Sequence, residues 1–361
     1  MKPSKYIISG GGTGGHIYPA IAIADELKAQ DPRALIVFVG AYGKMEMEKV
    51  PQAGYKIHGL WISGLQRKQL WRNVLFPLKL GISLLQSLVT WLRYRPDVLI
   101  GTGGFASGPM LFIGNLLGSK TLLQEQNSYP GITNKLLAKK ANAIAVAYPG
   151  MERFFPKEKI TYTGNPLRSS LLQIEGLKDQ SLRHFGLKGD HKQLVILGGS
   201  LGAQRINELV ASQLEFFTAL NLEVIWQCGK LYYDRYQHLA TDRIKIYPFI
   251  KEMNLLYSAA DIIISRAGAS SVSELCLVGK TTLLIPSPNV AENHQFHNAN
   301  ALVKQRAAVL IEEKDLEHSF QTVFKAVVES PEEQLSLRNN IRLMAKPEAT
   351  KEIIKLIHQL H

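Results

Sequence analysis

Short, continuously apolar runs alternate with longer amphipathic stretches along almost the whole chain. Runs of this kind, separated by helical stretches, are typical of parallel sheets covered by helices on both faces. The sequence therefore predicts strands at residues 6–9, 35–40, 98–101, 121–124 and 143–146, and again at 194–197, 224–228, 245–247, 262–265 and 282–285.

The pattern restarts halfway along the chain. A short strand, a Gly-rich turn and a helix are predicted at residue 6 and again at residue 194, and Gly164 and Pro166 between them indicate a hinge. The predicted fold is α/β, with two Rossmann-like, doubly wound parallel-sheet domains facing a central cleft. Because open α/β sheets bind ligands at the carboxyl ends of their strands, we expect the site in that cleft.

Composition narrows the class of protein. The length of 361 residues suits two α/β domains, and 46% hydrophobic with 20% charged residues describes a globular chain. The only two cysteines, Cys228 and Cys276, form no metal motif or disulfide framework, and no signal peptide is expected before the first strand. These features predict a protein of the cytoplasm. The net charge of +12 favours an anionic partner.

Much of this positive charge surrounds a Leu-rich stretch at residues 70–92. Pro77, Gly81 and Gln86 make it a poor transmembrane helix. One or two amphipathic helices lying in a lipid interface fit the pattern, and an ordinary half-buried helix fits it equally well. The predicted surface patch comprises Arg67, Lys68, Trp71, Arg72, Leu75, Leu78 and Lys79, with Trp91 on the same face.

The first Gly-rich turn contains Gly10-x-Gly12-x-x-Gly15, the spacing of a dinucleotide fingerprint. A nicotinamide site also needs a carboxylate at the end of the second strand, and none occurs here before Glu46. The sequence therefore argues against a nicotinamide cofactor and favours an anion-binding turn at a helix start. His16 follows this turn, either as a general base or as a side chain that caps the turn.

Further Gly-rich turns follow other predicted strands, at residues 101–109, 197–207 and 265–275. Another predicted strand, 121–124, is followed by Glu125, Gln126 and Asn127. We expect polar side chains at this position to point into the cleft. Four such turns exceed the needs of one phosphate, so they suggest two diphosphate-bearing substrates and group transfer between them. His294 and His297 lack the further ligands of a metal site.

Taken together, the motifs GGGTGGHIYPA, GTGGFASGP, EQNSYPGITNK, GNPLR, GGSLGAQRIN, SRAGASSVSEL and AENHQFHNA resemble the MurG family. Its members are UDP-N-acetylglucosamine–N-acetylmuramyl-(pentapeptide) pyrophosphoryl-undecaprenol N-acetylglucosamine transferases. The resemblance implies a GT-B fold and an inverting, β-1,4-forming transfer that converts lipid I to lipid II in peptidoglycan synthesis. It also implies an acceptor and membrane-association domain over 1–163, a donor domain over 164–340, and a helix in 341–361 that packs back on the first domain.

The resemblance assigns roles residue by residue. His16 becomes the leading candidate for the general base that deprotonates the muramyl C4 hydroxyl. The alternative is that His16 only supports the loop. Ile250 is expected to offer backbone groups to uracil, and Glu274 to take the ribose hydroxyls. Thr102, Gly103, Gly104 and Phe105 are expected to hold the acceptor diphosphate. The full set of expected UDP-N-acetylglucosamine contacts is Thr13, Gly14, Gly15, Asn127, Arg168, Ser200, Ile250, Ala269, Ser270, Ser271, Val272, Ser273, Glu274 and Gln295.

We expect no cofactor and no tightly bound metal, because no paired carboxylates are found for one; helix N-termini and Arg168 would carry the diphosphate charge. The expected partners are UDP-N-acetylglucosamine, lipid I and an anionic membrane surface, which places the enzyme peripherally on the cytoplasmic face of the inner membrane. Leu201 stands where the family often has Gln. The alternatives are a non-hydrolysing UDP-N-acetylglucosamine 2-epimerase and a nucleic-acid-binding protein. The first would need paired cleft carboxylates, and the second would place aromatic residues among the basic ones.

Overall fold

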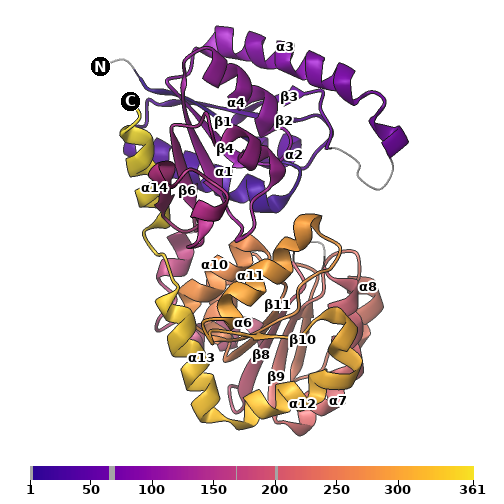
Figure 1. Ribbon diagram of the computed structural model, residues 1–361. Coiled ribbons are helices and arrows are strands. Elements are labelled where there is room, and N and C mark those ends of the chain that lie inside the picture. The colour runs from indigo at the N-terminus through magenta and orange to yellow at the C-terminus, as the bar shows by residue number, and fades with distance from the viewer. Residues whose placement is uncertain (1–2, 65–69, 168, 200–201) are drawn as a thin grey trace. The chain divides into compact units, whose positions relative to one another are not determined.

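The chain forms two compact units in the computed structural model, which describes residues 3–64, 70–167, 169–199 and 202–361 (Figure 1). Unit 1 comprises Met1–Leu167 and Glu348–His361, and unit 2 comprises Arg168–Pro347. The unit boundaries thus follow residues 167 and 347, whereas the sequence had placed them after residues 163 and 340.

Unit 1 is built on one parallel sheet of seven strands in the order β3-β2-β1-β4-β5-β6-β7. Successive residues of a strand point to opposite faces, and both faces of this sheet are apolar. Tyr6 and Ile8 of β1 pack on one face and Ile7 on the other. The strands are β1 Lys5–Gly10, β2 Leu35–Ala41, β3 Lys56–Leu60, β4 Val98–Gly103, β5 Lys120–Glu125, β6 Ala143–Val146 and β7 Ile160–Tyr162.

Helices cover both faces of this sheet. The last helix of the chain packs against α1, and its Ile353, Ile354 and Ile357 are buried in the core on that face (Figure 1). On the other face α4 covers the sheet, and α3 packs on α4. The helices of unit 1 are α1 Gly14–Gln30, α2 Glu46–Gln52, α3 Phe76–Tyr94, α4 Ser107–Leu116, α5 Ile132–Leu137 and α14 Ala349–His358.

Unit 2 repeats this plan with a parallel sheet of six strands in the order β10-β9-β8-β11-β12-β13. Its strands are β8 Lys192–Leu197, β9 Leu222–Gln227, β10 Ile244–Tyr247, β11 Ile262–Ser265, β12 Thr281–Leu284 and β13 Val309–Leu310. Its helices are α6 Lys178–Phe185, α7 Gln204–Ala219, α8 Tyr233–Tyr236, α9 Met253–Ala259, α10 Ala269–Val278, α11 His294–Val303, α12 Leu316–Glu329 and α13 Pro331–Leu343. The predicted fold of two doubly wound parallel-sheet domains is confirmed.

Lys280, directly before β12, gives unit 2 a pH-dependent stability. Burial lowers the pKa of its ammonium from 10.5 to about 8, although the nearby Asp261 raises it. Below pH 8 both the folded and the unfolded chain carry the proton, so the folded state bears the full cost of the buried charge. Between pH 8 and 10.5 the folded chain releases the proton first, and stability rises with pH.

We therefore expect Lys280→Met to raise the free energy of unfolding at pH 7 by about 1–3 kcal/mol, since one pKa unit corresponds to about 1.4 kcal/mol. The gain should shrink towards pH 10.5, as measured by urea unfolding at several pH values. Lys304→Met, at an exposed position of unit 2, is the control and should change little. An unchanged stability of Lys280→Met at pH 7 would contradict this account.

Candidate functional site

The order of the strands identifies one favoured ligand position in each unit. In unit 1 the chain leaves β1 and β4 in opposite directions across the sheet, and in unit 2 it does so from β8 and β11. Ligands of open α/β sheets bind at such switch points, beyond the carboxyl ends of the strands. The four Gly-rich turns found in the sequence follow these four strands.

A buried carboxylate, that of Glu46, is hydrogen-bonded to the turn after β1. Glu46 is fully buried, and its Oε2 accepts a hydrogen bond from the Gly12 N–H at 2.9 Å while its Oε1 accepts one from Ala41 N–H at 3.0 Å. The Gly12 N–H is therefore used within the protein. At the start of α1 the N–H groups of Gly14 and Gly15 have no intrahelical acceptor, so they remain suited to an anion.

The turns after β1 and β4 interlock through their backbones. Gly11 N–H donates to the Gly103 carbonyl at 3.3 Å. A Cβ placed on Gly104 would lie only 2.2 Å from the Gly11 carbonyl oxygen, and Gly104 has a φ of +81°. Phe105 packs over Gly12, where an added Cβ would lie 3.2 Å from its ring. The predicted acceptor-diphosphate residues of the second turn thus lie against the first turn.

His16 lies where these two turns meet. The residue is partly exposed, and Nδ1 of its ring lies 2.9 Å from Oε1 of Gln126. Its carbonyl accepts a hydrogen bond from Thr102 Oγ1 at 2.9 Å. An added Cβ on Gly103 would lie 2.9 Å from His16 Cε1 and Nδ1, so the ring rests on that glycine. His16 is thus a partly exposed residue whose ring is held in place, as a general base requires.

The segment after β5 differs from what the sequence predicted. Glu125 and Gln126 do not point outward: both are buried and hydrogen-bonded within unit 1. Glu125 accepts bonds from Asn127 N at 3.0 Å, Asn134 Nδ2 at 2.9 Å and Gly131 N at 3.2 Å, so it fixes the turn into α5. Of the three polar residues only Asn127, a predicted donor contact, is partly exposed.

In unit 2 a buried glutamine joins two predicted donor segments. Gln227, at the end of β9, accepts from the Ile250 N–H at 2.9 Å and donates to the Gly199 carbonyl at 3.1 Å. The Ile250 N–H, one of the backbone groups expected to meet a ligand, is therefore already used within the protein. Sequence reasoning missed Gln227, because its partners are brought together only by the fold.

The predicted ribose-binding carboxylate is also fixed. Glu274 of α10 is buried, and its Oε2 accepts from Tyr257 of α9 at 2.9 Å. The hydroxyl of Ser270, in the first turn of α10, is buried without a hydrogen-bond partner among the described residues. A helix N-terminus with an unbonded hydroxyl in its first turn is suited to a diphosphate. The predicted contacts Ala269, Ser270, Ser271, Val272, Ser273 and Glu274 all belong to this helix.

Gln295, in the first turn of α11, belongs to the same part of unit 2. Its Oε1 accepts from Ser287 N at 2.9 Å, and α11 packs beside α10. Asn298 ties α11 to the turn before α10 through the Ala267 carbonyl at 3.2 Å. Two further predicted contacts, Arg168 and Ser200, lie outside the described residues, as does Leu201.

Helix α3 carries an apolar face turned to solvent. Leu75 precedes the helix, and Leu78, Leu85, Val89 and Leu92 follow at helical spacing, each more than half exposed. The buried residues of α3 are instead Ser83, Ser87 and Thr90, whose hydroxyls bond backbone carbonyls of their own helix. Phe76, Leu80, Trp91 and Tyr94 of the same helix pack on the unit 1 core, so α3 has apolar side chains on its outer face as well as its inner one, unlike the usual surface helix.

Only some residues of the predicted surface patch belong to the part of the chain that the structure describes. Trp71, in a short 3-10 helix at Leu70–Asn73, is 71% exposed, while Lys79 bonds Ser63 at 3.3 Å. Trp91 is not on the exposed face as predicted: it packs on the unit 1 core and donates to Ser119 at 2.7 Å. Arg67, Lys68 and the side chain of Arg72 lie outside the described residues.

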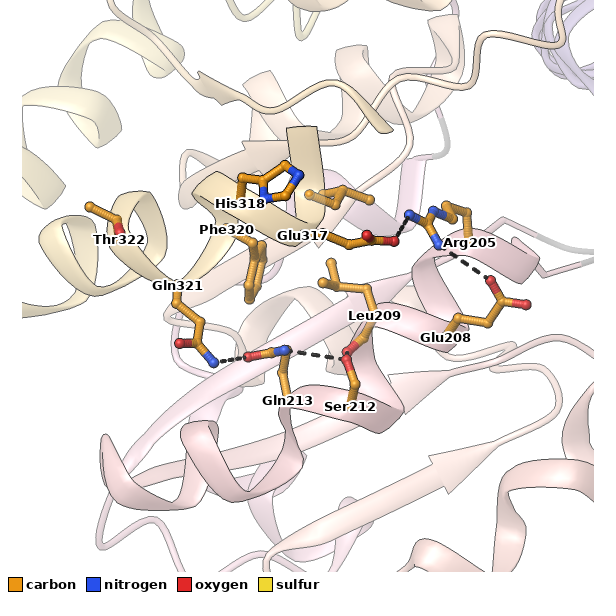
Figure 2. A pocket seen from close by; sticks show the side chains of 11 residues that line it. Arg205, Glu208, Leu209, Ser212, Gln213, Glu317, His318, Phe320, Gln321 and Thr322 are labelled. Atoms are coloured by element: carbon orange, nitrogen blue, oxygen red, sulfur yellow. Dashed lines mark hydrogen bonds and ion pairs between the residues drawn. The ribbon is translucent and has the colours of Figure 1, made fainter. Parts of the chain in front are cut away.

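Figure 2 shows a separate groove on unit 2, between α7 and α12. Its charged side chains bond one another: Arg205 lies 2.6 Å from Glu317 and 3.8 Å from Glu208. This groove contains none of the residues predicted to bind a substrate. Within the described part of the chain, no cluster of His, Cys, Asp and Glu suited to a metal is found. Nor does any described helix have the length and apolar character needed to cross a membrane.

Comparison with known proteins adds independent observations. Residues 6–146 match the glycosyltransferase family 28 N-terminal domain, and residues 193–357 match the family 28 C-terminal domain. A relative from Flavobacterium psychrophilum is 53% identical over 100% of this chain and 98% of its own. One from Christiangramia forsetii is 50% identical over 99% and 97%. Both are named UDP-N-acetylglucosamine–N-acetylmuramyl-(pentapeptide) pyrophosphoryl-undecaprenol N-acetylglucosamine transferase. The crystal structure of Acinetobacter baumannii MurG superimposes with a TM-score of 0.80 at 26% identity, covering 99% of this chain and 100% of that one.

Proposed function

This chain belongs to glycosyltransferase family 28, and we propose that it transfers N-acetylglucosamine from UDP-N-acetylglucosamine to the C4 hydroxyl of the muramyl sugar of lipid I. The product is lipid II, the precursor of peptidoglycan. The observation that carries this proposal is identity of about half over the full length to relatives named for that transfer. The same relatives favour the transferase over a UDP-N-acetylglucosamine 2-epimerase.

We propose that unit 2 holds the donor. The N-terminus of α10 and the Ser270 hydroxyl would meet the diphosphate, where the helix dipole stabilises the charge that develops on the departing UDP. Glu274, fixed by Tyr257, would accept hydrogen bonds from the ribose hydroxyls. The Ile250 carbonyl would accept one from the uracil. No metal or other cofactor enters this scheme.

We propose that unit 1 holds the acceptor and its base. The backbone of Thr102–Phe105 would meet the acceptor diphosphate beside the ring of His16. In the reaction the C4 oxygen forms a bond to the anomeric carbon as the bond from that carbon to the UDP oxygen breaks. The proton of the C4 hydroxyl passes to His16, and the electron pair of the broken carbon–oxygen bond leaves with UDP. Attack opposite the leaving group inverts the anomeric centre and gives the β linkage.

We further propose that the exposed face of α3 rests on the inner membrane at its cytoplasmic surface, where the lipid-linked acceptor resides. Leucine side chains at this face would enter the interface, and the neighbouring basic residues would meet anionic headgroups. This arrangement accounts for a helix that buries Ser83 and Ser87 and leaves Leu78 and Leu85 in solvent.

The double substitution Leu78→Glu with Leu85→Glu should reduce binding to vesicles of anionic phospholipid at least tenfold, because two apolar anchors become charges. Activity on a short-chain, water-soluble acceptor should be retained. Leu335→Glu is the control, since Leu335 is 57% exposed, like Leu78 at 55%, but lies in unit 2. Equal vesicle binding by all three proteins would exclude this face as the membrane surface.

The proposed activity is tested by UDP release from UDP-N-acetylglucosamine with and without a short-chain lipid I analogue. The transferase should release UDP only in the presence of the acceptor, at a rate that saturates with both substrates. Release at the same rate without the acceptor would refute the proposal.

A further inference from the structure

A histidine can take a proton only through a ring nitrogen that carries none, so the tautomer of His16 decides whether it can act as a base. Its Nδ1 is 2.9 Å from Oε1 of Gln126. If that oxygen accepts a hydrogen bond, Nδ1 carries the proton and Nε2 has the lone pair. The orientation of the Gln126 amide therefore determines the chemistry of the ring.

Backbone carbonyls fix that orientation. The Gln126 side chain is buried, and its Nε2 donates to the carbonyls of Thr102 at 2.7 Å and Gln124 at 3.1 Å. Turning the amide over would place its oxygen against these two carbonyl oxygens and lose both bonds. Such a loss is costly for a buried group, so Oε1 faces His16.

Neighbouring amides support the same arrangement. Gln126 Nε2 also contacts Gln124 Oε1, and Gln124 Nε2 donates to Asn165 Oδ1 at 2.9 Å. Asn165 Nδ2 in turn donates to the Gln126 carbonyl at 3.0 Å. In this closed network of Gln124, Gln126 and Asn165, every NH2 group faces an oxygen. The orientations of the three amides are therefore consistent with one another.

We propose that Gln126 is a positioning residue that holds His16 in the tautomer protonated at Nδ1, with Nε2 unprotonated and available to the acceptor hydroxyl. The role in catalysis rests on the proposed function, but the tautomer does not. Since Nδ1 keeps its proton when Nε2 takes another, the Gln126 oxygen accepts the same Nδ1–H in the neutral and in the charged ring. Gln126 thus directs the ring in both states.

The tautomer can be read directly from 15N-histidine-labelled protein by long-range 1H–15N NMR, without any substrate. The His16 signals are identified among those of ten histidines by their loss in His16→Gln. We expect a protonated Nδ1 and an unprotonated Nε2 in the wild type near pH 8. In Gln126→Leu the ring should shift towards the tautomer protonated at Nε2. A wild-type ring protonated at Nε2 would overturn the proposal, whether or not the protein is a transferase.

Kinetics separate positioning from a general loss of structure. Gln126→Leu should lower kcat about tenfold with little change in either KM, and should have no further effect in a His16→Ala background. Gln334→Leu is the matched control, because it removes a buried amide that likewise donates to two backbone carbonyls, those of Val327 and Val328, but lies in unit 2 and belongs to no part of this network; it should retain the wild-type tautomer. Equal losses of kcat in both variants, with additive effects on His16→Ala, would instead make Gln126 a purely structural residue.

Discussion

His16→Ala should lower kcat for acceptor-dependent UDP release by about 10²- to 10⁴-fold, the usual contribution of a general base. The muramyl hydroxyl is a poor nucleophile unless its proton is removed as the new bond forms. His16 is the partly exposed residue held between the two Gly-rich turns of unit 1, and Gln126 fixes the Nδ1 side of its ring. The KM for UDP-N-acetylglucosamine should change much less than kcat.

His58→Ala is the control for this variant. His58 also lies in unit 1, on β3, but its Nε2 is bonded to the Tyr94 hydroxyl at 2.8 Å. Its loss should leave kcat within about twofold of wild type, the size of effect expected for a residue outside the chemistry. Full transferase activity in His16→Ala would remove the base from this account and leave His16 as support for the loop.

Gly104→Ala should reduce the free energy of unfolding by about 3 kcal/mol and abolish most of the activity. Its φ of +81° alone costs an L-residue roughly 1–2 kcal/mol. In addition, the new Cβ would lie 2.2 Å from the Gly11 carbonyl oxygen, so one of the two interlocked turns must move. Because this movement displaces the surroundings of His16, kcat should fall by more than the loss of folded protein alone would cause.

Gly118→Ala separates the two causes. Gly118 has almost the same φ, +82°, but no atom lies within 4 Å of its added Cβ. This variant should lose only about 1–2 kcal/mol, as measured by urea unfolding, and keep its activity. If both variants lose the same stability and the same activity, the contact between the two turns has no special importance.

The strands show how far sequence reasoning reaches. The ten predicted runs all fall on strands of the structure, although Cys228 and Ile285 lie just beyond them. The strands that were missed are β3, β7 and β13, and all three lie at the edge of a sheet. An edge strand is paired on one side only and is less completely buried, so its sequence need not contain the continuous apolar run that marks a central parallel strand. The remaining edge strand, β10, was nevertheless predicted.

The sequence predicted the Gly-rich turns of the site, but it did not predict the buried side chains that hold these turns and His16 in place. Gly-rich segments after apolar runs identify the four turns, because tight turns at helix starts need glycine. Glu46 entered the sequence argument only as a carboxylate too late in the chain for a nicotinamide site, yet it holds the Gly12 N–H. The pairing of His16 with Gln126 spans 110 residues. Local patterns carry no information about such contacts. They arise because the parallel sheet places the carboxyl ends of β1 and β5 on the same side.

The central claim is tested most directly by identifying the product made from UDP-N-acetylglucosamine and a short-chain lipid I analogue, using mass spectrometry and the anomeric coupling in NMR. We expect one new β-1,4-linked N-acetylglucosamine on the muramyl sugar for each UDP released. Formation of UDP-N-acetylmannosamine, with the acceptor unchanged, would contradict the account.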